Sequence, residues 1–185
     1  VTTKSLRFSP DLSGIEWKAL GMPLASAVIK NSTEEEISAP SVQNVDNGIW
    51  FARLKDNKTP EFVVDESAFG MAGLWAANGD TYTISSEGAF EFKTLEEPAA
   101  PTETGTFLMC SNPNTFTITL KQSAYILTAD GTSFEQEVNP EIKPFQSFVL
   151  TDAKTLSTLR SLRIGDGVVT GNQTIEPVDG YYLSL

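Results

Sequence analysis

The chain contains no histidine and only one cysteine, Cys110, among its 185 residues. Most hydrolytic and transfer enzymes use a base that titrates near neutrality, and without histidine this base has to be a carboxylate or a lysine with a strongly shifted pKa. Cys110 has neither a histidine to activate its thiol nor a second cysteine with which to form an internal disulfide. We therefore expect a noncatalytic protein that is held together by packing, with Cys110 in or near the core.

Long apolar runs are also absent. The longest, such as Ala124 to Leu127 and Phe148 to Leu150, are far shorter than the ~20 residues that span a bilayer. With 13 basic against 24 acidic residues, the net charge of −11 repels nucleic-acid phosphates and anionic lipid surfaces. These features argue against a membrane-spanning segment, a nucleic-acid partner and a membrane-surface role.

Motifs for cofactors and metals are missing as well. The chain has no Walker loop, no G-x-S-x-G elbow and no zinc-ligand spacing. The glycine cluster at Gly165, Gly167 and Gly171 opens no helix, so it predicts a hairpin turn and not a phosphate-binding loop. The acidic run Glu34 to Glu36 alternates between faces on an extended segment and predicts a solvated loop. We expect no catalytic residue, no cofactor and no metal.

Turn signals and alternating apolar residues dominate what is present. Asx-Gly pairs at 47–48, 78–79, 130–131, 166–167 and 179–180 favour tight hairpins. Period-two alternation predicts strands around Trp17, Phe90 and Ile118. Further expected strands are Ile49–Leu54, Glu61–Val64, Thr81–Ser85, Thr106–Met109, Ala124–Thr128, Phe145–Leu150, Ser161–Ile164 and Tyr181–Leu185. The sequence predicts an all-β protein, an antiparallel β-sandwich or barrel-like fold.

Helical signals are weak, so only one or two short helical turns are expected. Thr151–Leu162 begins with a plausible cap at Asp152, but its many threonines and serines favour a turn-rich connection. A second helical turn is expected at Asp65–Ala68.

The segment 96–104 contains two prolines and no apolar periodicity, which predicts an exposed, semi-extended loop. We expect a single domain, 1–185, crossed by this loop, because a β domain of about half the length is marginal in stability. The alternative is two small subdomains, 1–95 and 105–185.

Aromatic side chains provide the candidate ligand site. Trp50, Trp75 and Tyr82 are candidates for stacking on the apolar faces of sugars. Trp17 alternates with apolar neighbours on one strand face and is expected in the core. If the protein does bind glycans, it is a carbohydrate-binding module or a glycosidase that uses two of its many carboxylates.

Four further strings are Trp17 to Leu24, Gly105 to Phe107 with Tyr125 to Phe134, Ile142 to Leu150, and Leu159 to Gly165. Together they resemble a β-rich module of exported, surface-displayed Bacteroidetes proteins. That module reads W-x-T-L-C-L-P-F early, and I-x-P-F and R-S-L-R-I late. This chain differs at Gly21 in place of Cys, at Leu24 in place of Phe, and at Gln146-Ser147 in place of Arg-Ala.

The resemblance implies export, with an adhesive, partner-binding or scaffold role and an unknown protein or glycan as partner. No catalytic residues are carried over from the module. The chain begins at Val1 without a basic segment followed by an apolar one, so we expect that a signal peptide or lipoprotein leader has been removed. The alternative function is the carbohydrate-binding module or carboxylate-dependent glycosidase, and the oligomeric state stays open.

Overall fold

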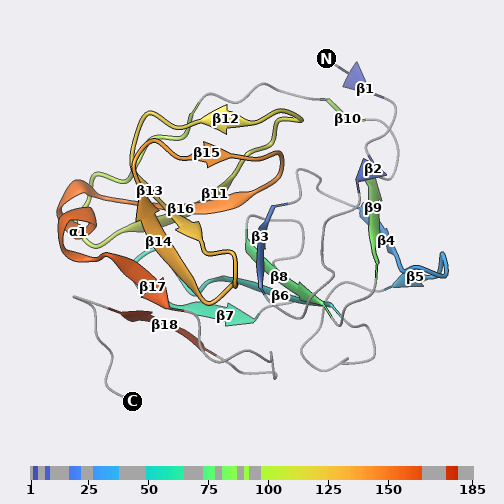
Figure 1. Cartoon of the computed structure of the whole chain (residues 1–185), viewed down its shortest axis with the longest axis horizontal. Helices are drawn as coiled ribbons and strands as arrows, with labels where there is room; N and C mark the ends of the chain where they lie inside the picture. Colours follow the sequence, from blue (N-terminus) through green and yellow to red (C-terminus); the bar gives the residue numbers. More distant parts are fainter. Residues whose placement is uncertain are drawn as a thin grey trace.

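The computed structural model of the chain describes residues 2–3, 7–8, 17–21, 27–37, 49–64, 73–77, 81–86, 90–91, 97–163 and 174–178. Within these ranges the chain forms eighteen strands and one short helix (Figure 1). The predicted all-β class is confirmed. The strands form several antiparallel sheets, and none of the described sheets closes into a barrel.

Ten strands form the largest sheet, in which every neighbouring pair is antiparallel. Its order is β11 (Phe107–Ser111), β16 (Ser147–Thr151), β13 (Ala124–Leu127), β14 (Ser133–Glu137), β17 (Ser161–Arg163), β18 (Thr174–Val178), β7 (Phe62–Val64), β6 (Ile49–Leu54), β8 (Gly73–Ala77) and β3 (Lys18–Leu20).

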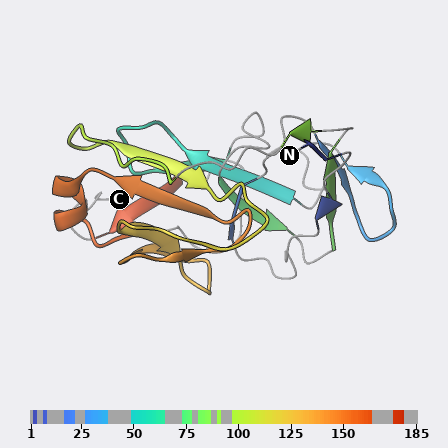
Figure 2. The same cartoon turned by 90° about the horizontal axis from the view of Figure 1, so that it is seen from above.

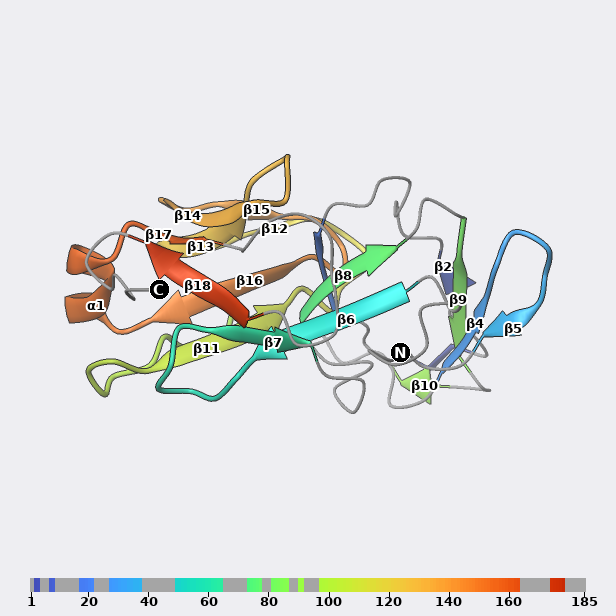
Figure 3. The same ribbon diagram turned by 90° about the horizontal axis from the view of Figure 1, so that it is seen from below.

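Three smaller sheets complete the described fold. A four-stranded sheet has the order β2 (Arg7–Phe8), β9 (Thr83–Ser86), β4 (Ala27–Lys30) and β5 (Glu36–Ile37), and the two-stranded sheets are β12 (Ile118–Thr119) with β15 (Glu141–Ile142) and β1 (Thr2–Thr3) with β10 (Phe90–Glu91). The four-stranded sheet lies at the opposite end of the molecule from the helix (Figures 1 and 3).

Strand β16 is buried along its whole length and separates two apolar clusters. Successive side chains of a strand point to opposite faces. Phe148 and Leu150 accordingly pack in one cluster with Leu120, Ala124 and Ile142, while Val149 packs in the other. The continuous apolar run that marks Phe148 to Leu150 in the sequence therefore reflects a strand with no wet face.

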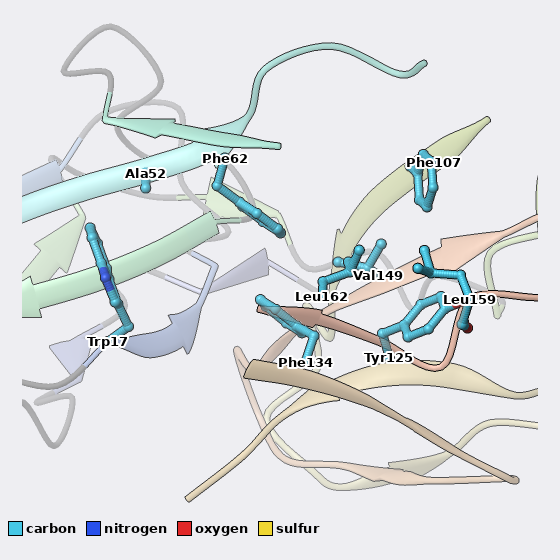
Figure 4. Close-up of a cluster of buried hydrophobic side chains, with 9 residues drawn as sticks. All are labelled: Trp17, Ala52, Phe62, Phe107, Tyr125, Phe134, Val149, Leu159 and Leu162. Atoms are coloured by element: carbon cyan, nitrogen blue, oxygen red, sulfur yellow. The ribbon is translucent and has the colours of Figure 1, made fainter. Parts of the chain in front are cut away.

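The cluster around Val149 draws side chains from both sides of segment 96–104. Trp17, Ala52 and Phe62 precede the segment, and they pack with residues that follow it. Figure 4 shows these side chains converging between the strands: Phe107, Tyr125, Phe134, Val149, Leu159 and Leu162 come from the later part. The single-domain organisation stays a prediction about folding behaviour, and this common core is the reason to expect it.

The expected exposed loop is only partly exposed. Thr102 to Thr104 are exposed, but Glu97 is half-buried and its Oε1 accepts hydrogen bonds from the Lys121 N–H at 2.7 Å and from Gln122 Nε2 at 3.1 Å. Glu103 pairs with Lys58 at 2.6 Å. The segment is therefore attached to the body at two points.

Two of the strings that carry the family resemblance meet in space. The Gly21 N–H, just after β3, donates to the Phe145 carbonyl at 2.7 Å, and Leu20 forms an isolated bridge with Gln146. Strand β3 ends one side of the large sheet, whereas Gln146 precedes β16, the second strand from the other side. The sheet thus curls until its two ends approach each other, as the view in Figure 2 illustrates.

Phe145 lies in a turn and not at the start of a strand, which corrects the expected strand 145–150. The Gln146 N–H donates to the Lys143 carbonyl at 3.1 Å, and Phe145 has a φ of 63°. A proline at the second position and a positive φ at the third are the features of a type II turn. The ring of Phe145 is nevertheless buried, and β16 begins two residues later at Ser147.

The segment after β16 also differs from expectation, because a helix, α1 (Ala153–Thr158), replaces the turn-rich connection. Asp152 is its N-cap, as its sequence position indicates: the carboxylate accepts from the Thr155 N–H at 3.0 Å. The helix ends after six residues, and within the described ranges no helix is long and apolar enough to cross a membrane. The expected helical turn Asp65–Ala68 and strand Tyr181–Leu185 lie outside the described residues.

Candidate functional site

The described residues do not show the three candidate aromatic side chains together on one sugar-binding surface. Tyr82, beside β9, is 1% exposed, so neither face of its ring is available for stacking on a sugar. This corrects the sequence-based interpretation of Tyr82. Trp50 and Trp75 lie in the adjacent strands β6 and β8, where Trp50 pairs with Ala76 and Trp75 with Phe51. Their side chains lie outside the described part of the structure, and their role in stacking stays a prediction.

Trp17 is 4% exposed and belongs to the core cluster, as the alternation of its neighbours predicts. Glu34 and Glu35 lie in an exposed turn, as the sequence predicts, whereas Glu36 is also exposed but begins β5. Asn31 Oδ1 accepts from the N–H groups of Thr33 at 3.1 Å and Glu35 at 2.9 Å, and these hydrogen bonds close the turn.

Cys110 lies on β11 and is partly buried, packed against the cluster that contains Phe148. Burial raises the pKa of its thiol to about 11. A thiol with this pKa is almost wholly protonated at neutral pH, so the position favours a packing role over a nucleophilic one.

Among the residues that the structure describes, Asp152 is a buried acid with several hydrogen-bond donors around its carboxylate. Burial by itself raises the pKa of a carboxyl, but the Thr155 hydroxyl and the N–H groups of Thr155, Gly105 and Thr106 outweigh that effect and hold the pKa of Asp152 below its ordinary value. The Thr155 hydroxyl lies 2.7 Å and the Gly105 N–H 2.8 Å from its Oδ1. The carboxylate joins α1 to the end of segment 96–104 and has a structural role.

No group of three or more histidine, cysteine or acidic side chains is arranged to hold a metal ion in the ranges that the structure describes. A polar recess lined by Glu135, Gln136, Arg160 and Ser161 lies between β14 and β17. The side-chain amide of Gln136 in this recess is not available to a ligand, because its Nε2 donates to the carbonyls of Leu156 and Leu159.

The best candidate site is a groove along the outer edge of β11, which was not found by sequence reasoning. It has a volume of about 210 Å³. We call it the β11 groove, and it is lined by Arg53, Leu54, Asp56, Asn57, Phe107, Leu108 and Met109. Leu108 is 41% exposed, an unusual degree for a leucine within a strand. The run Phe107-Leu108-Met109 is apolar throughout and shows no alternation, so the sequence did not indicate that Leu108 is exposed.

Both faces of β11 contribute to this groove. Phe107 and Met109 point to the face of the main core cluster, whereas Leu108, between them, points to the other face. A groove lined by consecutive residues of one strand runs along the edge of that strand and not over either face. The opposite wall is the end of β6, where Arg53 donates to the carbonyls of Leu54 and Lys55 at 2.6 and 2.9 Å.

No family model matches the chain, and searches of curated proteins and of solved structures gave no match either.

Proposed function

We propose that this chain is a noncatalytic, partner-binding module of an exported cell-surface protein. The observation that carries the proposal is the β11 groove, where the exposed Leu108 lines an apolar hollow at a sheet edge. Exposed apolar surface beside a sheet edge is a common feature of protein-binding sites.

The resemblance to exported Bacteroidetes modules supports the cellular context of the proposal. The residues that carry this resemblance serve the core: Trp17, Ile142 and Phe148 are buried, and Gly21 and Phe145 join the two strings through backbone hydrogen bonds. A shared pattern of this kind specifies a fold and leaves the surface free to vary, so the function of each member depends on its exposed residues.

The chemistry of the described side chains also supports a binding role over catalysis. The Cys110 thiol has a raised pKa, and the buried Asp152 carboxylate is used as a helix cap. Neither group is poised to transfer a proton or attack a substrate at neutral pH.

The test uses the full-length protein in the cells that produce it. A photo-reactive amino acid replaces Leu108 in one variant and Thr158, an exposed residue on α1, in a matched control. We expect surface labelling of intact cells to reach the protein, and irradiation to give a discrete covalent adduct for the Leu108 variant only. Protein found solely inside the cells, or the same adducts from both positions, would contradict the proposal.

A further inference from the structure

The hydrogen-bonding pattern of β11 identifies which of its backbone groups face the groove. In an antiparallel pair, alternate residues direct their N–H and C=O groups toward the partner strand. The Asn112 N–H donates to the Gln146 carbonyl at 3.0 Å, on the side of β16, whereas the Phe107 N–H donates to the Asn57 carbonyl at 2.8 Å, away from β16. The two residues are five positions apart, so their opposite directions agree with regular alternation.

The same alternation assigns the residues between them. Leu108 and Cys110 direct their backbone groups to β16, with which they pair at Leu150 and Phe148. Met109 and Ser111 direct theirs outward. Strand β11 ends the large sheet on this side, and in the described part of the chain no hydrogen bond is made by the outward groups of Met109 or Ser111.

The loop after β6 already occupies the position of a neighbouring strand at one end of β11. Asn57 supplies a carbonyl to Phe107, where the next strand of the sheet would supply one. Beyond Asn57 the groove lies open beside Met109. Its geometry therefore fits a short extended backbone that continues the sheet from the point where Asn57 leaves it.

We propose that the β11 groove binds a short extended segment of a partner protein, which adds to the sheet as a strand beside β11 and carries apolar residues flanked by basic ones. This inference rests on the proposed partner-binding function. The backbone of the segment bonds to Met109, and its apolar side chains contact Leu54 and Leu108. Backbone bonds provide the affinity in such additions, and side-chain contacts provide the specificity.

The net charge of the chain is the reason to expect basic residues on either side of the apolar part of the partner segment. The chain carries a net charge of −11, which attracts cationic segments and repels acidic ones. Within the groove the cation Arg53 is engaged with the Leu54 and Lys55 carbonyls, whereas the exposed Asp56 carboxylate accepts from the N–H groups of Lys58 at 2.8 Å and Thr59 at 2.7 Å. These donors keep Asp56 ionised at neutral pH beside the site where a basic flank would lie.

Proline substitution tests the proposal with a matched control. Met109→Pro removes an outward N–H without removing a bond to β16, a position at which an edge strand tolerates proline. Thr119→Pro is the control. The Leu120 N–H, just after β12, donates to the carbonyl of Pro140, just before β15, so the N–H of its neighbour Thr119 faces away from β15. Circular dichroism and thermal melts establish that both variants fold.

The probe is a fluorescent nine-residue peptide in which alternating threonine and valine residues lie between pairs of lysines. We expect it to bind the wild-type chain and Thr119→Pro equally, and Met109→Pro about tenfold or more weakly. Hydrogen exchange at the Met109 amide should slow when the peptide is added. The same peptide N-methylated at every threonine and valine should not bind, and replacing its lysines by glutamates should weaken binding.

Four results would overturn the proposal: absence of binding, equal binding by folded Met109→Pro, slow exchange of the Met109 amide without peptide, and dimers that Met109→Pro dissociates. The third result would mean that another segment of this chain occupies the edge, and the fourth that a second copy does. None of them contradicts export or the cross-linking result at Leu108, so failure of this inference is distinguishable from failure of the proposed function.

Discussion

Phe62 and Phe134 stack face to face, with ring centroids 5.3 Å apart and planes inclined by 2°. Phe62 belongs to β7 and Phe134 to β14, so this contact joins strands that lie on opposite sides of segment 96–104. The two strands are not neighbours in the sheet, because β17 and β18 lie between them in the strand order. Their rings therefore meet across the interior of the curled sheet.

A cut in segment 96–104 should leave the protein in one piece. We expect a glutamate-specific protease to cleave first at Glu103, whose side chain is 74% exposed, and later at Glu97, which is held by Lys121 and Gln122. The fragments should co-elute on a sizing column and unfold in one cooperative transition, since their side chains share a core. Separate fragments that each keep a folded melt would show two domains.

At Phe145 the glycine variant should be more stable than the alanine variant, which is the reverse of the usual order for these two substitutions. Phe145→Ala should lower the free energy of unfolding by about 3 kcal/mol or more, because it removes a buried ring. Phe145→Gly should cost about 1 kcal/mol less than Phe145→Ala, because glycine adopts the φ of 63° without strain. Urea melts of both variants measure the difference, and a glycine variant less stable than the alanine one would contradict the assigned turn.

Asp152 should make stability depend on pH in the acid range. The folded-state pKa of Asp152 lies below the unfolded value of about 3.9, so its contribution is present above that value and is lost as the pH falls toward the folded-state pKa. Asp152→Asn should destabilise the protein by roughly 1 to 2 kcal/mol at pH 7, because both carboxylate oxygens accept hydrogen bonds and an amide has only one oxygen to offer.

The difference between the wild-type protein and Asp152→Asn should shrink below about pH 4, where the unfolded carboxyl is protonated. Denaturant melts at several pH values measure it. Glu137→Gln is the control, because it makes the same acid-to-amide change at an exposed side chain on β14. A difference for Asp152→Asn that is constant from pH 3 to pH 7 would contradict the assigned role.

Gly21 and Ser111 should be energetically coupled. A Cβ placed on Gly21 would fall 2.3 Å from the Ser111 Cβ, a distance at which one backbone must shift. Gly21→Ala should therefore cost about 1 to 3 kcal/mol in the wild-type background and clearly less in the Ser111→Gly background. A double-mutant cycle of thermal melts measures the coupling, and additive effects would place the two residues farther apart.

The tryptophans can be separated by fluorescence. In the double variant Trp50→Phe, Trp75→Phe, only the buried Trp17 remains of the three tryptophans, so acrylamide should quench its emission poorly. The additional quenching of the wild-type protein then reports the exposure of Trp50 and Trp75. If the wild-type protein is quenched no more than the double variant, neither tryptophan is a sugar-stacking platform.

Local signals predicted the parts of the fold that depend on neighbouring residues. The expected strand 49–54 matches β6, and Asp130-Gly131 forms the expected turn, with a φ of 70° at Gly131 and a hydrogen bond from the Thr128 N–H to the Ser133 carbonyl. Asp152 caps α1 because its carboxylate reaches the N–H of the third residue along the chain, which is visible in a sequence.

Features that depend on distant contacts were missed. Strand β14 has one apolar residue, Phe134, among polar ones, so it shows little alternation, yet its backbone pairs with both β13 and β17. Phe145 keeps a strained turn because Gly21 and Asn112 both bond to its backbone. The β11 groove exists because β6 ends opposite β11, and no local pattern encodes that meeting.

The central position of β16 has a consequence for the nascent chain. Its ladder partners β11 and β13 are both made before it, and each lacks its central neighbour until residues 147–151 have left the ribosome. Up to that point the cluster of Phe107 and Tyr125 lacks Val149, and the cluster of Leu120 lacks Phe148 and Leu150. Productive folding therefore waits until residues 147–151 have emerged, and until then the exposed strand edges are open to chaperones or to aggregation.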